Sequence, residues 1–213
     1  MVRKRSARLA VVACASAASL GLLAGASPAA AKTKTKTKTF NQCLSTASPI
    51  TDRTTGFASI FVPVPKNGKK VQTGTVTAVG PVGTRATHTF AGDLTMVLVS
   101  PAGKPVTLVS ERDQEADGYG TGSQGCSGSP VLFGDTFPTP ISSIDSQTTS
   151  DTPISGSFRP EHPLSGFLGG PARGFWTLVV TDCCLGDAGS VDVLSLNLTY
   201  TYKVPAKKKR GKR

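Results

Sequence analysis

The feature that constrains the fold most is a strict alternation of apolar and polar residues in the stretch SVDVLSLNLTYTY, which begins at Ser190. A period of two residues is the signature of a β-strand that buries one face and exposes the other. On this pattern the buried face carries Leu194, Leu196, Leu198, Tyr200 and Tyr202.

The same alternation recurs along the chain. It is found in DLTMVLVSP, from Asp93, and in GFWTLVVTD, from Gly174, where Trp176 shares a face with aliphatic residues and is predicted to be a structural core residue. Further candidate strands are VQTGTVTAV, RATHTF and PVTLVS, each bounded by Gly or Pro. Because no window has a convincing helical period, the pattern predicts an all-β fold, an antiparallel jelly-roll β-sandwich.

The first 31 residues have the order of a secretory signal peptide. Four basic residues are followed by an apolar run from Leu9 to Gly25 and by Ala29-Ala30-Ala31, after which cleavage is expected. No later stretch approaches the roughly 20 apolar residues that a membrane-spanning helix needs. The sequence therefore predicts a secreted, extracellular protein without a membrane span.

Basic residues are concentrated at the two ends of the chain. Of the 24 Lys and Arg, 4 lie in the signal peptide, 4 in the repeat KTKTKTK from Lys32 and 6 in the tail KKKRGKR from Lys207. All 13 acidic residues lie within residues 39–206, which are slightly acidic as a whole. Because the basic segments have little apolar surface to bury, residues 32–45 are expected to form a disordered Lys/Thr-rich arm and linker, and residues 204–213 a disordered basic tail.

These basic arms suggest a class of partner. Outside a cell the available anions include wall polymers and acidic polysaccharides, so the arms are interpreted as a weak electrostatic tether to an anionic cell-wall or surface polymer. Nucleic acid is not an expected partner of an exported chain. A solubilising tail without a specific partner is the simpler alternative.

Cysteine usage agrees with export. Cleavage of the signal peptide leaves Cys43, Cys126, Cys183 and Cys184, an even number that predicts two disulfides. Neighbouring side chains of an extended chain point to opposite faces, so each member of the Cys183-Cys184 doublet is expected to reach a distant partner. The prediction is that Cys43 and Cys126 each pair with one cysteine of the doublet, in either order.

The stretch GCSGSPVLF, from Gly125, looks like the nucleophile loop of a trypsin-like protease. Attack by the Ser127 hydroxyl would require a base and an acid that orients it. The histidines available after cleavage are His88, within a predicted strand, and His162, between Glu161 and Pro163. Neither stands in the base motif of such proteases, so no catalytic residue is predicted and the chain is not expected to be an enzyme.

Several motifs in order resemble the P domain, or Homo B domain, of subtilisin-like proprotein convertases and secreted bacterial proteases. They are ATHTFAGDLTMVLVSPAGKPVTLVS, then VLFGD, GSFRPEHPLSGFLG, RGFWTLVVTD and GDAGSVDVLSLNL, and the domain is assigned to residues 46–203. The chain departs from the family at Leu194, where many members have Trp, and in having no subtilisin-type catalytic motifs. The resemblance implies a jelly-roll sandwich that packs on, stabilises or helps to mature a catalytic domain.

Two further expectations depend on this resemblance. Some bacterial P domains hold a structural calcium ion, and the turn residues Asp93, Asp135 and Asp187 are the candidate oxygen ligands here. The favoured function is a secreted noncatalytic protein that binds or stabilises a partner such as a subtilisin-like serine protease. The alternatives are a surface adhesion or polysaccharide-binding module tethered by the basic arms, and a serine-type endopeptidase by family association alone.

Overall fold

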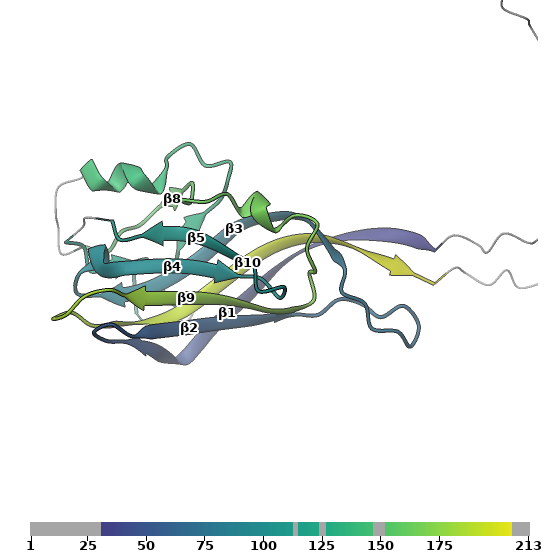
Figure 1. The fold of residues 1–213 in the computed structure, drawn as a ribbon, viewed down its shortest axis with the longest axis horizontal. Coiled ribbons are helices and arrows are strands. Elements are labelled where there is room, and N and C mark those ends of the chain that lie inside the picture. The colour runs from purple at the N-terminus through teal and green to yellow at the C-terminus, as the bar shows by residue number, and fades with distance from the viewer. Residues whose placement is uncertain (1–30, 113–114, 124–126, 147–151, 206–213) are drawn as a thin grey trace, which may run out of the picture. The chain divides into compact units, whose positions relative to one another are not determined.

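The computed structural model describes residues 31–112, 115–123, 127–146 and 152–205, and these form two packed β-sheets (Figure 1). Sheet A has the order β1-β10-β3-β7-β8, with β6 also paired to β3, and sheet B has the order β2-β9-β4-β5. All pairs are antiparallel except β7 with β8. The strands are β1 (Lys32–Ile50), β2 (Thr55–Val62), β3 (Thr75–His88), β4 (Leu94–Val99), β5 (Pro105–Ser110), β6 (Gly118–Tyr119), β7 (Val131–Phe133), β8 (Ser157–Phe158), β9 (Gly174–Asp182) and β10 (Gly189–Val204).

The connections between the sheets are those of a jelly roll. Leaving aside the two-residue strands β6 and β8, successive strands change sheet at every step except from β4 to β5. The long strands β9 and β10 each lie between two partners, which places the strongest alternating sequences inside the sheets. The predicted all-β, antiparallel sandwich is confirmed.

The core lies between the facing sides of the two sheets. Sheet A contributes Leu194, Leu196, Leu198 and Tyr200, and sheet B contributes Leu94, Met96, Leu98, Trp176, Leu178 and Val180, all fully buried. Each such side chain stabilises the fold by about 1.5–3 kcal/mol through the apolar surface that it removes from water. The alternation in the sequence therefore reports the burial of β4 and β9, and of β10 from Leu194 to Tyr200, correctly.

The strand β3 joins two segments that the sequence predicts as separate strands, VQTGTVTAV and RATHTF. The ladder with β10 changes register between Leu196↔Val82 and Leu198↔Val79, so Pro81 falls at an irregularity. Proline has no backbone N–H to donate to a ladder and is tolerated at such positions. One strand thus continues past the proline.

The prediction that residues 32–45 are disordered is wrong. They belong to β1, which pairs with β10 from Lys32↔Val204 onward. The Thr37 and Thr199 hydroxyls lie 2.8 Å apart, and the Asn197 side-chain amide donates to Thr39 Oγ1 at 3.1 Å. The Lys/Thr repeat has little apolar surface of its own, but β10 supplies both a hydrogen-bonding edge and matching hydroxyl side chains.

The folded unit is correspondingly longer than the predicted domain 46–203. The described residues from Ala31 to Pro205 group into one compact unit. Residues 1–30 of the predicted signal peptide 1–31 and the tail from residue 206 lie outside the described residues, whereas Val204 belongs to β10. Among the residues described, no helix has the length and apolar character needed to cross a membrane.

Candidate functional site

The outer face of sheet B carries a group of exposed aromatic rings. Phe57 and Phe61 come from β2 and Phe175 from β9, with 51%, 43% and 63% of their surfaces exposed. These residues alternate with buried ones along each strand, so their side chains point away from the core. Phe61 lies opposite Phe175 in the ladder, and their rings meet edge to face at 5.2 Å.

The residues around these rings are small, uncharged and regularly placed. Ser59 Oγ lies 2.9 Å from Thr177 Oγ1, and Thr55 Oγ1 lies 3.1 Å from Thr181 Oγ1. Phe57 is opposite Val179, which is opposite Val97 on β4, and this continues the apolar surface across the sheet. The outward-facing side chains are Thr55, Phe57, Ser59, Phe61, Thr95, Val97, Val99, Thr107, Phe175, Thr177, Val179 and Thr181.

We call this set the aromatic face. Its strands hold the backbone rigidly, and none of the side chains in the set is charged. At its margin the Arg173 guanidinium lies 5.2 Å from the centre of the Phe61 ring. An exposed apolar and aromatic surface with a polar margin is typical of a protein-binding surface.

The three aspartates predicted to bind calcium do not form one group of candidate ligands. Both carboxylate oxygens of Asp135 accept backbone N–H bonds from Leu164 and Ser165, at 2.7 and 2.8 Å. They thereby hold the start of the 3-10 helix η4 (Leu164–Phe167). Asp187 Oδ1 accepts a hydrogen bond from the Thr89 hydroxyl at 2.6 Å.

Asp93 lies in the 3-10 helix η1 (Ala91–Asp93), close to other acidic residues. Burial raises the pKa of its carboxyl, and the charges of Asp182 and Asp187 raise it further. Within the described parts of the chain, the only group of three or more side chains able to ligate one metal is Asp93 with Cys183 and Cys184. The three aspartates therefore do not form one ligand set, and calcium binding stays a prediction from the sequence.

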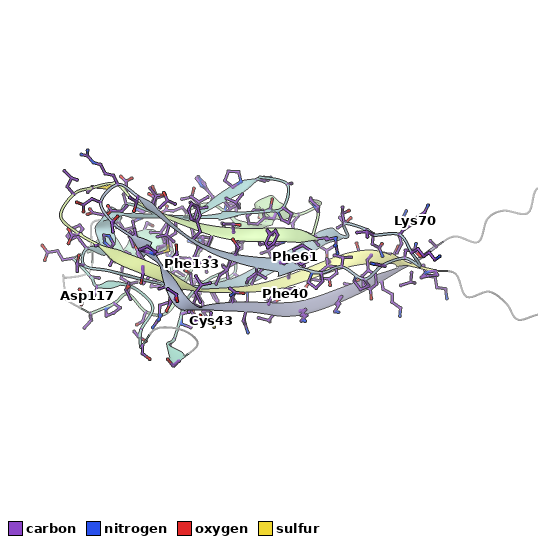
Figure 2. The ribbon with its side chains drawn as sticks, turned by 90° about the horizontal axis from the view of Figure 1, so that it is seen from below. Phe40, Cys43, Phe61, Lys70, Asp117 and Phe133 are labelled. Carbon is purple, nitrogen blue, oxygen red and sulfur yellow. A yellow bond between two sulfur atoms is a disulfide. The ribbon has the colours of Figure 1, made fainter. Side chains whose placement is uncertain are left out.

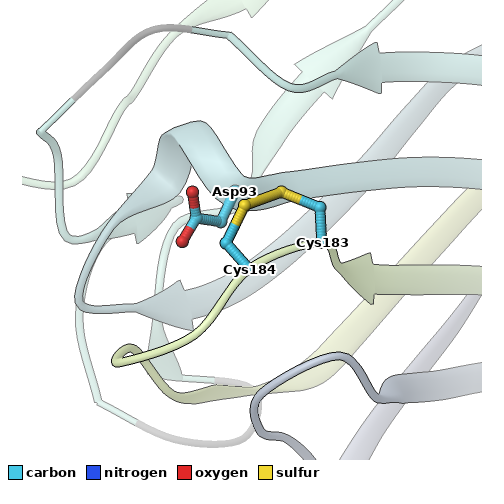
Figure 3. A group of neighbouring side chains, drawn as sticks. All are labelled: Asp93, Cys183 and Cys184. Carbon is cyan, nitrogen blue, oxygen red and sulfur yellow. A yellow bond between two sulfur atoms is a disulfide. The ribbon is translucent and has the colours of Figure 1, made fainter.

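Cys183 and Cys184 are bonded to each other, so their predicted pairing with Cys43 and Cys126 is wrong (Figure 3). The doublet follows the last residue of β9, where the alternation of an extended strand no longer applies. Backbone contacts hold the loop: the Cys183 N–H donates to the Asp93 carbonyl at 3.1 Å, and the Cys184 N–H donates to Asp182 Oδ1 at 2.8 Å. As a disulfide, the two sulfurs offer no thiolate to a metal.

Cys43 is also disulfide-bonded, and it lies in β1 at the point where the ladder with β10 shifts register. Cys126 lies outside the described residues. The prediction of two bridges in the mature chain is compatible with one bridge at Cys43 and one within the doublet.

Ser127 shares a hydrogen bond with the Ser123 hydroxyl, at 2.7 Å between the oxygens. The imidazole of His88 is buried: its Nδ1 is 2.7 Å from the Phe90 carbonyl oxygen, whereas its Nε2 lies 3.5 Å from Asp182 Oδ2 without a hydrogen bond. The backbone of His162 donates to Thr107 in the loop before η4. Of the two histidines, His88 is the one whose side chain is buried in the fold.

Trp176 is fully buried, as are its neighbours on the inner face of β9. Its indole N–H donates to the Ala172 carbonyl at 3.0 Å, and its ring meets Phe167 edge to face at 5.0 Å. The polar atom of the side chain is thus satisfied inside the core.

The aromatic face is the surface that the sequence analysis did not identify. Its signal is the stretch TGFASIFV of β2, in which Ala58, Ile60 and Val62 are buried between exposed phenylalanines. Because both faces carry apolar residues, the stretch has no apolar-polar alternation to reveal it as a strand.

Comparison with known proteins finds no matching family model and no matching curated protein. Two solved structures align over 79% of this chain: a complex of Aeromonas sobria serine protease with the chaperone ORF2, with a TM-score of 0.45 and 19% identity, and Aeromonas sobria serine protease, with a TM-score of 0.44 and 18% identity. The match spans 27% of each of those chains. A likeness this weak transfers neither an activity nor a partner to this chain, and the resemblance to P domains stays a prediction from the sequence motifs.

Proposed function

We propose that this chain is a secreted, noncatalytic β-sandwich module that binds and stabilises a serine protease of the subtilisin class. The observation that carries the proposal is the aromatic face. A rigid, uncharged sheet surface with three exposed phenylalanines exposes apolar area that a partner would remove from water. The sequence motifs that resemble P domains supply the class of partner.

The buried position of the His88 imidazole supports a noncatalytic role. A serine nucleophile needs a base within hydrogen-bond reach. The Ser127 hydroxyl is bonded to Ser123, whereas the buried imidazole of His88 faces Phe90 and Asp182. The opposing hypothesis, that the chain is itself a peptidase, requires Ser127 to react with a serine-directed fluorophosphonate.

Affinity capture combined with fluorophosphonate labelling tests both statements. The immobilised mature chain is exposed to culture fluid of the producing organism, and the retained proteins are labelled and identified by mass spectrometry. The proposal predicts a retained, labelled serine protease and no label on this chain. Labelling of Ser127, or the absence of any labelled protease from the retained fraction, would contradict it.

Variants localise the interaction to the aromatic face. Phe61→Ser/Phe175→Ser removes two aromatic anchors, which is expected to cost at least about 2 kcal/mol of binding free energy, or roughly 30-fold in Kd. Leu168→Ser/Leu185→Ser is the matched control because it removes two exposed apolar side chains, 48% and 63% exposed, outside the face. Equal loss of the protease with both variants would exclude the aromatic face as its binding surface.

A further inference from the structure

Eight lysines lie at the end of the sandwich where β1 begins and β10 ends. The loop between β2 and β3 is held against this end by Gln72, whose side-chain amide donates to the Pro65 carbonyl at 2.6 Å and to the Lys203 carbonyl at 2.8 Å. Figure 2 shows Lys70 of this loop at that end and Asp117 at the opposite end of the sandwich. The lysines are Lys32, Lys34, Lys36 and Lys38 of β1, Lys66, Lys69 and Lys70 of the loop, and Lys203 of β10.

The four lysines of β1 form a row along an edge of sheet A. Every second residue of a strand points to the same face. Successive lysine side chains of the row therefore leave the backbone about 6.8 Å apart, and the row is about 20 Å long. Lys34 is opposite Tyr202 and Lys36 is opposite Tyr200. At the end of the row, the ammonium of Lys38 lies 5.1 Å from the centre of the Phe40 ring.

These positive charges are not neutralised by neighbouring carboxylates. The ion pairs among the described residues involve Arg85, His88 and Arg112, and none involves a lysine. Asp93 interacts with Asp182, Asp187 and Glu111. Because Asp93 lies beside the Cys183-Cys184 loop at the end of β9, this acidic group is at the other end of the sheets. The chain also continues from β10 into a segment with six more Lys and Arg.

A pocket of about 510 Å³ opens at this end of the sandwich, and of the eight lysines only Lys203 lines it. It is lined by threonine residues of β1, β3 and β10, namely Thr33, Thr75 and Thr201, and by Lys203. Gly74, with φ of +64°, lets the loop pass close to β10, since a Cβ there would lie 3.2 Å from the Thr201 carbonyl oxygen. Thr33 is opposite Lys203 in the ladder and alternates with Lys32 and Lys34, so the pocket lies on the other face of sheet A from the lysine row of β1.

We propose that this lysine end binds a linear phosphodiester-linked polyol polymer of the kind found in cell walls. A flexible chain with one negative charge per repeat can follow a single row of point charges along a strand edge. The predicted export of the chain places it where such polymers occur. The proposal is independent of the protease partner, because the lysine end and the aromatic face involve different residues.

The lysine row lacks the side chains that sequence-specific readout of DNA uses. Sequence readout of DNA relies mainly on arginine, asparagine and glutamine side chains placed in a groove. Here the row consists of lysines, which recognise phosphate as a charge without a fixed geometry.

Binding of the full mature chain to fluorescent poly(glycerol phosphate), measured by anisotropy over a range of salt concentrations, tests the proposal. Each neutralised charge of a flexible polyanion contributes about 0.7 to the slope of log K against log salt concentration. Lys34→Gln/Lys36→Gln is therefore expected to reduce that slope by about 1.4. Arg53→Gln/Arg159→Gln, which removes the same charge elsewhere on the surface, is expected to leave it unchanged.

Each outcome of this experiment either supports or overturns the proposal. Saturable binding with a slope reduced only by the lysine pair supports the lysine end as the site. Equal reductions with both pairs would show attraction to net charge alone and would overturn the proposal, as would the absence of binding at low salt. Tighter binding to duplex DNA than to poly(glycerol phosphate) would overturn the assignment of the occupant.

Discussion

Among individual residues, the pair Arg85 and Asp192 bears most on the loop that carries Ser127. Both side chains are almost completely buried, and Arg85 Nε donates to Asp192 Oδ1 at 3.0 Å. Arg85 Nη2 also donates to the Asp192 carboxylate, and Nη1 donates to the carbonyl oxygens of Gly122 and Ser123. Strand β3 thereby fixes the loop through one cation.

Removal of one partner of this pair should destabilise the protein strongly. Arg85→Met leaves the Asp192 carboxylate buried without its partner, which is expected to cost about 3–5 kcal/mol in the free energy of unfolding. Urea denaturation followed by tryptophan fluorescence measures this loss. The double variant Arg85→Met/Asp192→Leu should recover much of it, and a single variant as stable as the wild type would contradict the account.

Asp93 makes stability depend on pH. Because burial and the charges of Asp182 and Asp187 raise its pKa above the ordinary value of 3.8, the folded state binds this proton more tightly than the unfolded state does. The contribution to stability is therefore present below pH 3.8 and is lost as the pH rises through the raised pKa. Asp93→Asn should be more stable than the wild type at pH 7 and equally stable at pH 3.

Urea unfolding at the two pH values measures this difference. Asp117→Asn, at an exposed position, serves as the control and should change neither value. A stabilisation by Asp93→Asn of equal size at pH 3 and pH 7 would show that charge is not its cause.

At the scale of elements, the sequence correctly predicts the strands in which apolar residues recur at every second position. The segments predicted for β9 and β5 match their observed bounds, and β10 is only slightly longer than predicted, because apolar residues recur with period two in each. The two-sided strand β2 has no such alternation, since Phe57 and Phe61 are apolar and exposed.

The elements that the sequence analysis misjudged depend on partners far away in the chain. The Lys/Thr repeat becomes a strand only because β10 lies beside it, 162 residues later at the Thr37–Thr199 contact. The Cys183-Cys184 bridge depends on where β9 ends, a boundary that alternation does not fix to one residue. The candidate calcium ligands occupy three turns, and sequence spacing carries no information on which turns meet.

Strand β1 should protect its own amides from exchange with solvent. Backbone hydrogen bonds of the ladder slow amide exchange, whereas a disordered arm exchanges at the rate of an unstructured peptide. Because β1 is an edge strand, the alternate amides of Lys32–Thr39 that bond to β10 should exchange about tenfold or more slowly than in the same sequence as a free peptide. Hydrogen exchange detected by mass spectrometry makes the comparison, and equal rates would show that the arm is not paired in solution.

For the whole molecule, the sandwich separates three chemically different surfaces. The aromatic face covers the outside of sheet B, the lysine end lies where β1 begins, and the acidic residues lie at the opposite end with the Cys183-Cys184 loop. Such a separation would let one domain bind a partner protein through apolar area while a charged end holds a surface polymer. The two proposed interactions should consequently respond differently to salt, because hydrophobic burial is not screened and lysine contacts are.

The central claim is that the aromatic face stabilises a serine protease, and the half-life of that protease at an inactivating temperature tests it most directly. The account predicts that the wild-type chain lengthens the half-life and that Leu168→Ser/Leu185→Ser does so equally. It also predicts that Phe61→Ser/Phe175→Ser has lost the effect. A half-life unchanged by the wild-type chain, or lengthened as much by the phenylalanine variant, would contradict the account.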